Sequence, residues 1–334
     1  MFKAQYTTRG PIPQDVIEAV EFEEPALQEG QVLIELLAAP INPSDVLTLN
    51  GQYGILPPLP SVGGNEGVGK VVKHGPGVDS PAIGQTVLLP VGIGSWATHM
   101  VAEAKGLVAL PNGVDPVQLS MITINPPTAS LLLSEFVHLK EGDWVIQNAA
   151  NSGVGSYLIA LAKQRGLKTV NVVRTEAQAK ALLQAGADVA LVDGVVDGAS
   201  LAKRVKLATD GAIIRLGIDA VGGSATSRLG ECLADGGTVV NYGAMSGDPC
   251  TLPPTLIIFK DITVRGFWLA KWFRTASPEQ QKQLFGNIIG LIAAGKLAAP
   301  VHGTYPVKRI KEAVAQASSS GRNGKVIVVG DSLL

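Results

Sequence analysis

The chain has 334 residues, of which 46% are hydrophobic and 16% are charged, and its formal net charge is −1. This length is too great for one compact core and suits two domains, and the composition excludes a disordered chain. The near-neutral charge, without a basic stripe, argues against nucleic acid and anionic membranes as partners, and no apolar run approaches the ~18 residues of a membrane-spanning helix.

The N-terminus and the cysteines bear on the location of the protein. The first residues, Met1 to Tyr6, run directly into sheet-like sequence, without an apolar signal segment or an Arg/Ser-rich transit segment. Two cysteines, Cys232 and Cys250, are too few for a disulfide framework in a chain of this size, so we expect both to be reduced. These observations predict a cytoplasmic protein.

The first part of the chain, up to residue 119, is rich in glycine and proline. Short runs of β-branched and alternating residues lie between the turn signals and predict strands over 31–36, 67–72 and 85–89. This part of the chain is therefore expected to form an irregular, β-rich domain.

From residue 120 onwards, apolar strands alternate with helical segments. Such alternation predicts right-handed βαβ units and an α/β domain with a parallel, doubly wound sheet. The predicted strands cover 144–147, 169–173, 189–192, 212–219, 238–242 and 262–264, and the predicted helices cover 154–164 and 176–185. A helix over 278–294 and a strand over 324–329 complete the chain.

The segment from Asn148 to Gly155 follows a predicted strand and opens a helix, which is the context of a dinucleotide-binding turn. Glycines in such a turn let the backbone approach the pyrophosphate, and the helix N-terminus supplies N–H donors. In G-x-G-x-x-G register the positions hold Ala150, Ser152 and Gly155, so only the last is glycine. We predict that the cofactor phosphates contact Asn151, Ser152, Gly153 and Val154; the alternative is an ordinary strand-to-helix turn.

The end of the second strand of this domain indicates which dinucleotide binds. NAD sites place an acidic residue there to hold the ribose 2′-OH, whereas this strand is followed by Arg174. A guanidinium pairs well with a 2′-phosphate, and a hydrogen bond to a charged group is worth roughly 1.5–3 kcal/mol, or on the order of 10- to 100-fold in affinity. Arg174 therefore predicts NADPH as cofactor; a solvated surface arginine is the alternative.

Several runs are similar to one known family. They are Asn42-Pro43-Ser44-Asp45, Gly51-Gln52-Tyr53-Gly54, residues 63–69, residues 125–129, residues 147–155 and Arg265-Gly266-Phe267-Trp268-Leu269. Together they resemble the zinc-free medium-chain dehydrogenases/reductases, in particular the 2-enoyl thioester reductase (mitochondrial trans-2-enoyl-CoA reductase) branch. The resemblance covers nearly the whole chain in order. It implies a GroES-like catalytic domain over 1–119 and 270–334 and a Rossmann domain over 120–269.

Zinc-dependent members of the superfamily bind the metal through cysteine, histidine and a second cysteine or acidic residue, with one position left open. The position that resembles the first cysteine holds Asn42, and the Gly-His-Glu motif reads Gly64-Asn65-Glu66. The remaining histidines, His74, His99, His138 and His302, show no ligand spacing. We therefore predict no metal site and interpret Glu66 as an internal pairing group.

The resemblance also implies the catalytic residues. Tyr53, in a tight Gly-rich loop, takes the place of the family's active-site tyrosine, as proton donor or hydrogen-bond donor; packing on neighbouring prolines is the alternative. Asn42 is a candidate to hold the cofactor ribose or the tyrosine, or is structural in an Asn-Pro turn. Trp268 is a candidate wall of the acyl pocket, or a dimer contact, because residues 262–269 suggest an edge strand that pairs across a two-fold axis.

The remaining cofactor candidates come from the ends of elements. Thr128 follows Asn125-Pro126-Pro127 and is predicted to approach the nicotinamide, with helix capping as the alternative. Gly243 ends a strand where backbone can meet the nicotinamide carboxamide. The full set of further candidates is Thr128, Tyr242, Gly243, Ala244, Phe267, Trp268 and Lys325.

The sequence as a whole predicts an NADPH-dependent oxidoreductase that reduces the carbon–carbon double bond of trans-2-enoyl thioesters, carried by CoA or acyl carrier protein, as a homodimer. A quinone oxidoreductase and an alkenal- or acrylyl-type reductase are alternatives with the same fold. A non-catalytic nucleotide-binding protein is the alternative of another class. The candidate cations for recognition of the carrier are Lys260, Lys271, Arg274 and Arg322.

Overall fold

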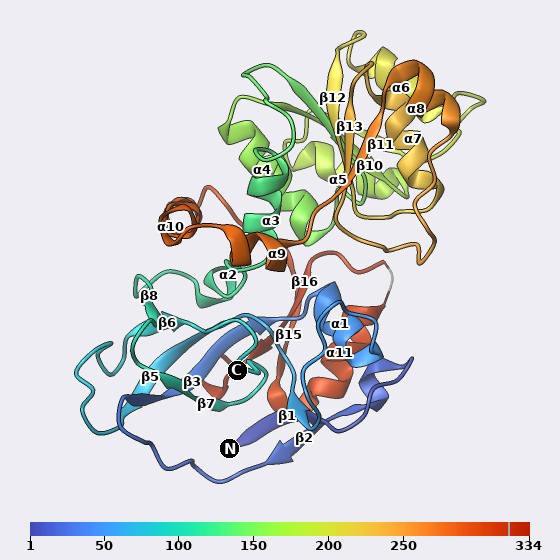
Figure 1. Cartoon of the computed structure of the whole chain (residues 1–334). Helices are drawn as coiled ribbons and strands as arrows, with labels where there is room; N and C mark the ends of the chain where they lie inside the picture. The colour runs from blue at the N-terminus through green and yellow to red at the C-terminus, as the bar shows by residue number, and fades with distance from the viewer. Residues whose placement is uncertain (320) are drawn as a thin grey trace. The chain divides into compact units, whose positions relative to one another are not determined.

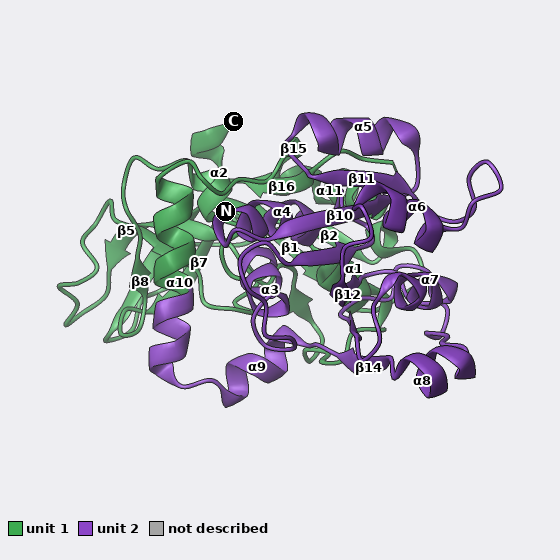
Figure 2. Cartoon of the chain, turned by 90° about the horizontal axis from the view of Figure 1, so that it is seen from above, with its two compact units in different colours: residues 1–124, 285–334 green, residues 125–284 purple. Residues whose placement is uncertain are grey.

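The computed structural model describes residues 1–319 and 321–334, and they form two compact units. Unit 1 comprises Met1–Ile124 and Phe285–Leu334, and unit 2 comprises Asn125–Leu284 (Figure 2). The sequence suggested divisions after residues 119 and 269. The second division falls later because it lies inside helix α10 (Pro278–Ala293), where no turn signal marks it.

Unit 1 is built on strand β3 (Gln31–Pro40), which is buried along almost its whole length. It is hydrogen-bonded to β5, β7 and β16 within a seven-stranded sheet, and a three-stranded sheet of order β2-β1-β4 accompanies it (Figure 1). The strands of unit 1 are β1 Phe2–Tyr6, β2 Ile17–Glu21, β3, β4 Ser61–Val62, β5 Val68–His74, β6 Thr86–Leu88, β7 His99–Glu103, β8 Val108–Ala109, β15 Val301–Pro306 and β16 Lys325–Val329. Its helices are α1 Pro43–Asn50, α2 Pro116–Leu119 and α11 Ile310–Ser318, with short 3-10 turns at Pro13–Asp15, Val307–Arg309 and Asp331–Leu333.

The pairing of β3 with β16 brings distant parts of the sequence together. The strands run antiparallel with Ile327 opposite Pro40, and the ladder continues where the Ile41 N–H donates to the Val326 carbonyl (2.9 Å). Asn42, which follows β3, therefore lies beside Lys325, which begins β16.

Unit 2 contains a six-stranded, all-parallel sheet of order β11-β10-β9-β12-β13-β14. The strand order reverses between β9 and β12, so the connections that leave the carboxyl ends of these two strands run in opposite directions along the sheet. This position is the topological switch point of the unit. Its strands are β9 Trp144–Gln147, β10 Lys168–Val173, β11 Val189–Val192, β12 Ile214–Asp219, β13 Thr238–Asn241 and β14 Thr263–Gly266. Its helices are α3 Asn125–Leu132, α4 Gly153–Gln164, α5 Glu176–Gln184, α6 Leu201–Ala208, α7 Ser224–Cys232, α8 Pro254–Lys260 and α9 Leu269–Thr275; α10 passes from this unit into unit 1.

Apolar side chains of the strands project from both faces of this sheet, and helices cover both faces. One buried cluster joins Val170 and Val172 of β10 to side chains of α6, α7 and α8. A second cluster joins Val173 to Ala179 and Leu182 of α5. The predicted fold class, a doubly wound parallel sheet with a separate β-rich domain, is confirmed.

The edge strand expected over residues 262–269 is shorter than predicted. β14 ends at Gly266, and α9 begins at Leu269, so Phe267 and Trp268 lie in the turn between them. Across the described ranges, no helix combines the length and apolarity that crossing a bilayer requires.

Candidate active site

Three polar side chains meet inside unit 1 and form what we call the Asn42 bridge: Asn42, Glu66 and Lys325. The Asn42 amide Nδ2 donates to Glu66 Oε1 (2.7 Å), and its Oδ1 accepts from Lys325 Nζ. Glu66 Oε2 also accepts from the backbone N–H groups of Thr123 and Ile124 (3.0 Å each). The bridge thus links the end of β3, the start of β16 and the last residues of unit 1 before α3.

The groups of the Asn42 bridge are almost inaccessible to water. Glu66 is 0% exposed and Lys325 is 5% exposed. Burial raises the pKa of Glu66 to about 7, although Lys325 and Asn42 oppose the rise. Burial likewise lowers the pKa of Lys325 to about 8, against the opposing field of Glu66 and Asp45. A buried charge is tolerated only when it is paired with an opposite charge. Here the Glu66 carboxylate and the Lys325 ammonium each stabilise the charge of the other.

Asp45 ties helix α1 to this cluster. At the third position of the helix, its Oδ2 accepts from the Asn42 backbone N–H (2.7 Å), as in a capping box. Its Oδ1 accepts from Asn65 Nδ2 (2.6 Å). Burial raises the pKa of Asp45 to about 6, although these hydrogen bonds oppose it.

These residues do not fit a zinc ion. The Asn42 carboxamide is hydrogen-bonded to a carboxylate on one side and an ammonium on the other, and the Asn65 amide donates to Asp45. Zinc sites use thiolate, imidazole and carboxylate ligands. Among residues 1–319 and 321–334, no group of three or more His, Cys, Asp and Glu side chains is placed to hold a metal.

Tyr53 lies in a fixed turn directly after α1. The helix ends at Gly51, whose φ of +77° is in the left-handed region that glycine adopts most readily. The backbone N–H groups of Gln52 and Tyr53 then donate to the Leu47 carbonyl (2.8 and 3.2 Å). The tyrosine side chain is half-buried and shares unit 1 with the Asn42 bridge.

In unit 2, the turn between β9 and α4 has the geometry of a phosphate-binding loop. Ala149 has a φ of +46°, and a Cβ on Gly155 would lie 2.4 Å from the Ala150 carbonyl oxygen, so that position requires glycine. Ser152 caps the helix by accepting from the Gly155 N–H (3.1 Å). Within the described chain, the N–H groups of Gly153 and Val154 have no acceptor, so two donors at the helix N-terminus are available to an anion.

Arg174 follows the adjacent strand at the same edge of the sheet. Gln147 of β9 pairs with Asn171 of β10, so the chain leaves both strands on one side. Arg174 is exposed, and no described residue forms a hydrogen bond or ion pair with its guanidinium. The position suits a cation that binds a solvent-accessible phosphate.

Sequence reasoning missed Asp219, which ends β12 at the switch point. Its Oδ1 accepts from Asn148 Nδ2 (2.6 Å) and from the Val221 and Gly222 N–H groups. Its Oδ2 accepts from the Thr226 hydroxyl (2.6 Å). Burial would raise the pKa of Asp219, but these donors outweigh it and the pKa is lowered. The available signal was an aspartate at the carboxyl end of an apolar strand.

The segment after β13 returns to the same edge. The Tyr242 N–H donates to the Asp219 carbonyl (2.9 Å), and Gly243 passes so close to Ala220 that a Cβ there would lie 2.7 Å from its carbonyl oxygen. The Tyr242 hydroxyl oxygen is buried without a properly aligned hydrogen bond to a described residue. Burial raises its pKa, and the neighbouring Ser152 hydroxyl offsets part of the rise. Ala244 follows, exposed.

The other candidates are placed separately. Phe267 is half-buried and packs edge-on against Phe136, with ring centroids 5.9 Å apart. Trp268 precedes α9 and stacks with Arg274 at 5.2 Å. Thr128 is buried within α3.

Of the four candidate carrier-binding cations, three donate to backbone carbonyls; one of them is Arg274, whose Nε donates to the Ala270 carbonyl (3.2 Å). Lys260 donates to the Glu231 and Leu233 carbonyls, and Arg322 donates to those of Ala317 and Ser319. Lys271 is exposed.

Comparison with known families agrees with this division of the chain. A model described as "Alcohol dehydrogenase GroES-like domain" matches residues 28–112, and one described as "Zinc-binding dehydrogenase" matches residues 153–284. The two matches fall in unit 1 and unit 2 respectively. The zinc in the second description belongs to the family, since the side chains that stand at the corresponding positions of this chain do not suit the ion.

Relatives of known name are reductases. The mitochondrial enoyl-[acyl-carrier-protein] reductases of rat and human are each 38% identical over 307 residues, which is 90% of this chain and 82% of each relative. Among solved structures, an Etr1p/NADP/crotonyl-CoA complex is 26% identical with a TM-score of 0.86, covering 98% of this chain and 99% of that one. An Escherichia coli quinone oxidoreductase complexed with NADPH is also 26% identical, with a TM-score of 0.84 and coverage of 98% and 100%.

The folds of the two units and the family matches therefore define a dehydrogenase/reductase with a GroES-like and a Rossmann domain. The chain belongs to the medium-chain dehydrogenase/reductase family, in the branch of the 2-enoyl thioester reductases.

The expected cytoplasmic location is corrected by this comparison. The relatives from rat, Dictyostelium discoideum and Arabidopsis thaliana are all named as mitochondrial proteins. The expectation rested on the composition of the first residues and on the small number of cysteines, which is weaker evidence than this agreement.

Proposed function

We propose that the protein is an NADPH-dependent reductase that saturates the carbon–carbon double bond of trans-2-enoyl thioesters without a metal. The observation that carries the proposal is the 38% identity, over nine tenths of the chain, to reductases named for this activity. The family's tyrosine at Tyr53 and the nucleotide-binding geometry of unit 2 support it.

The residues at the carboxyl edge of unit 2 fit the cofactor. The N–H groups of Gly153 and Val154 would bind the pyrophosphate, and Asn151 and Ser152 belong to the same turn. Arg174 would pair with the 2′-phosphate, which is the group that distinguishes NADPH from NADH. The backbone at Gly243 and Ala244, beside Tyr242, would meet the nicotinamide end, where Thr128, Phe267 and Trp268 are further candidates.

The chemistry adds a hydride to the β-carbon of the substrate and a proton to its α-carbon. NADPH, when bound, supplies the hydride. Negative charge then develops on the thioester oxygen, and hydrogen-bond donors directed at that oxygen lower the barrier. Tyr53 is the proposed donor and proton source, since a phenol carries an O–H donor and its turn is fixed by two backbone hydrogen bonds. Asn42 and Lys325, which belong to unit 1 as Tyr53 does, are proposed to orient the cofactor.

The direct test follows NADPH oxidation by the purified protein. trans-2-Hexenoyl-CoA and a simple quinone are compared as acceptors, with NADPH and with NADH. We expect rapid enoyl reduction that prefers NADPH and that falls on the order of 10²- to 10⁴-fold in Tyr53→Phe, as for loss of a general acid. Tyr305→Phe, in β15, is the matched control and should retain full activity.

Fast quinone turnover with an idle enoyl substrate would reject the proposal and favour the quinone oxidoreductase alternative, whose fold is equally similar. Tight NADPH binding without turnover of any acceptor would favour a non-catalytic protein. Presenting the same acyl group on CoA and on acyl carrier protein then identifies the carrier by kcat/KM.

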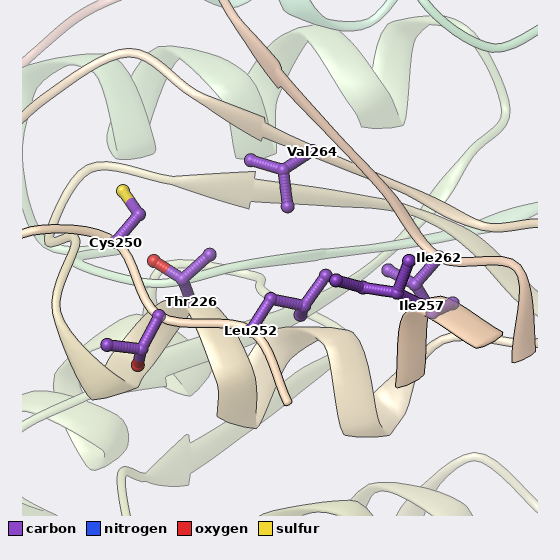
Figure 3. Close-up of a pocket in the computed structure, with 7 residues that line it drawn as sticks. Thr226, Cys250, Leu252, Ile257, Ile262 and Val264 are labelled. Carbon is purple, nitrogen blue, oxygen red and sulfur yellow. The ribbon is translucent and has the colours of Figure 1, made fainter. Parts of the chain in front are cut away.

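We further propose a homodimer that pairs through β14. This strand is at the edge of the sheet, so its outer N–H and C=O groups have no neighbouring strand in the described chain. Beside it lies an apolar hollow of about 320 Å³, which Figure 3 shows between Leu252, Ile257 and Val264. On the adjoining helix α8, Phe259 is 76% exposed. A second copy, related by a two-fold axis, would cover both features. The Candida tropicalis relatives are titled an Etr1p/Etr2p heterodimer, so chains of this branch do associate.

The dimer is tested by light scattering during size-exclusion chromatography. We expect the mass of a dimer for the wild type and of a monomer for Phe259→Glu. Leu207→Glu, on α6, replaces a residue that is 84% exposed and serves as control. A monomeric wild type at micromolar concentration would reject the proposal.

A further inference from the structure

The Asn42 bridge has only one favourable orientation of its amide. The oxygen faces the Lys325 ammonium and the nitrogen faces the Glu66 carboxylate. A flipped amide would set its NH₂ group against the ammonium and its oxygen against the carboxylate. The carboxylate therefore fixes the amide, and the amide in turn fixes the direction of the ammonium.

The Lys325 ammonium has one N–H donor that is not used within the described chain. An ammonium group has three N–H donors. Two of them have acceptors in unit 1, which are Asn42 Oδ1 and the Ile41 carbonyl oxygen (3.4 Å), and no other described residue accepts from the group. The third N–H is thus available to an oxygen atom of a ligand, although the side chain is 5% exposed.

Glu66 is itself held from a second side. Its Oε2 is fixed by the N–H groups of Thr123 and Ile124, and the Ser95 hydroxyl donates to its backbone carbonyl (2.7 Å). A carboxylate with this support cannot swing away, so it acts as the fixed end of the bridge. Nothing in the proposed chemistry uses Glu66 directly.

We propose that Glu66 is a positioning residue for cofactor binding: acting through the Asn42 amide, it keeps the Lys325 ammonium charged and directed at an oxygen atom of NADPH. The inference rests on the proposed function, because it takes NADPH as the ligand of Lys325. It assigns a role to a buried carboxylate that stands where zinc enzymes of the superfamily need a metal site.

The proposal makes cofactor binding depend on pH in a defined direction. Burial lowers the pKa of Lys325 to about 8; Glu66 and Asp45 raise it, and Arg322 lowers it. Because the charged lysine is the form that binds, affinity is lost as the pH rises through this pKa. Removing the charge of Glu66 lowers the pKa of Lys325 further, so the loss should begin at lower pH.

The experiment measures the NADPH dissociation constant by fluorescence titration from about pH 7 to about pH 9.5, on either side of the lysine pKa. We expect wild-type affinity to fall about 10-fold over this range, the size of one hydrogen bond to a charged group. Glu66→Gln should move the midpoint to lower pH, and Lys325→Met should bind weakly at every pH. Glu18→Gln, an exposed carboxylate of β2, is the control and should match the wild type.

A double-mutant cycle separates positioning from general damage. If Glu66 acts through Lys325, the double variant should bind NADPH no more weakly than Lys325→Met alone. Additive losses, or a weaker Glu66→Gln with an unshifted midpoint, would overturn the proposal. Should the variants not fold, a wild-type affinity independent of pH would overturn it as well. A wild type that binds no NADPH at all would instead reject the proposed function.

Discussion

Each unit contains a fully buried carboxylate, and the two carboxylates are held differently. Asp219 in unit 2 accepts hydrogen bonds from two side-chain amides, two backbone N–H groups and a hydroxyl, and its pKa is lowered. Glu66 in unit 1 accepts from one amide and two backbone N–H groups, and burial raises its pKa to about 7. Both side chains are 0% exposed, so burial alone does not decide the charge.

The difference shows what each carboxylate is suited to do. Asp219 is surrounded by neutral donors that stabilise its charge, so it stays ionised and serves as a permanent anchor for the switch point. Glu66 depends in part on the Lys325 ammonium, so its charge and that of the lysine support each other. The first arrangement gives rigidity, and the second gives sensitivity to pH and to substitution.

The largest effect is expected for Asp219→Asn. The amide nitrogen of asparagine would face donors such as the Thr226 hydroxyl, leaving buried groups unsatisfied, and we expect a loss of about 3 kcal/mol in the free energy of unfolding. Urea unfolding measures it, with Asp235→Asn, an exposed residue of the same unit, as control.

The pH dependence of this loss has a definite sign. Because the folded pKa of Asp219 is depressed, its stabilisation is present above the unfolded pKa of about 3.9 and disappears only as the pH falls through the folded value. The difference between wild type and Asp219→Asn should therefore be constant from about pH 6 to about pH 8. A difference that changes in this range would show that Asp219 titrates and would remove the contrast with Glu66.

A smaller effect is expected for Gly155→Ala in the phosphate-binding turn. The new Cβ would lie 2.4 Å from the Ala150 carbonyl oxygen, so the turn must shift, at about 1–3 kcal/mol. NADPH affinity should fall more than 10-fold, measured by fluorescence titration. Gly290→Ala, in α10, introduces the same methyl group into open space and should bind normally. Normal binding by both variants would mean that the turn does not hold the cofactor.

Arg174→Gln should change selectivity more than stability. The guanidinium is exposed, so its contribution lies near the lower end of the range for a charged hydrogen bond, and we expect a loss of about 10-fold in the preference for NADPH over NADH. The ratio of the two kcat/KM values is the measurement, and NADH turnover should be unchanged. Lys206→Gln, an exposed cation of α6, is the control. Equal losses with both cofactors would remove Arg174 from the 2′-phosphate.

The sequence gives more information about the carboxyl edge of unit 2 than about the Asn42 bridge of unit 1. The reason is the separation along the sequence of the residues that come together. The β9–α4 turn and Arg174 are read from βαβ units whose strands are close in sequence, so a local pattern determines which residues share an edge. Asn42, Glu66 and Lys325 come together only through the β3–β16 and β3–β5 pairings. No spacing in the sequence reveals that register.

Individual residues show the same limit. Glu66 was predicted to be an internal pairing group, but its partners were not predictable because they lie 24 and 57 positions away. Asp219 was missed because an aspartate at a strand end resembles an ordinary turn residue until its donors are seen. Lys260 and Arg322 looked like surface cations but bind backbone carbonyls, which depends on how the chain folds back near them.

The smallest effect concerns folding stability and the charge of Glu66. Its folded pKa is about 7 against about 4.3 in an unfolded chain, so its contribution is fully present below the lower value and is lost as the pH rises through the higher one. Lys325 has the opposite sign, because its pKa is depressed, and its contribution is lost as the pH falls through about 8. The lysine stays charged between about pH 5 and about pH 7, so only Glu66 titrates in that range, and we expect wild type to lose about 1–2 kcal/mol relative to Glu66→Gln there. Urea unfolding at several pH values, beside the constant difference expected for Asp219→Asn, measures it. A flat profile for Glu66→Gln as well would mean that both buried carboxylates stay ionised, and that the lysine alone responds to pH.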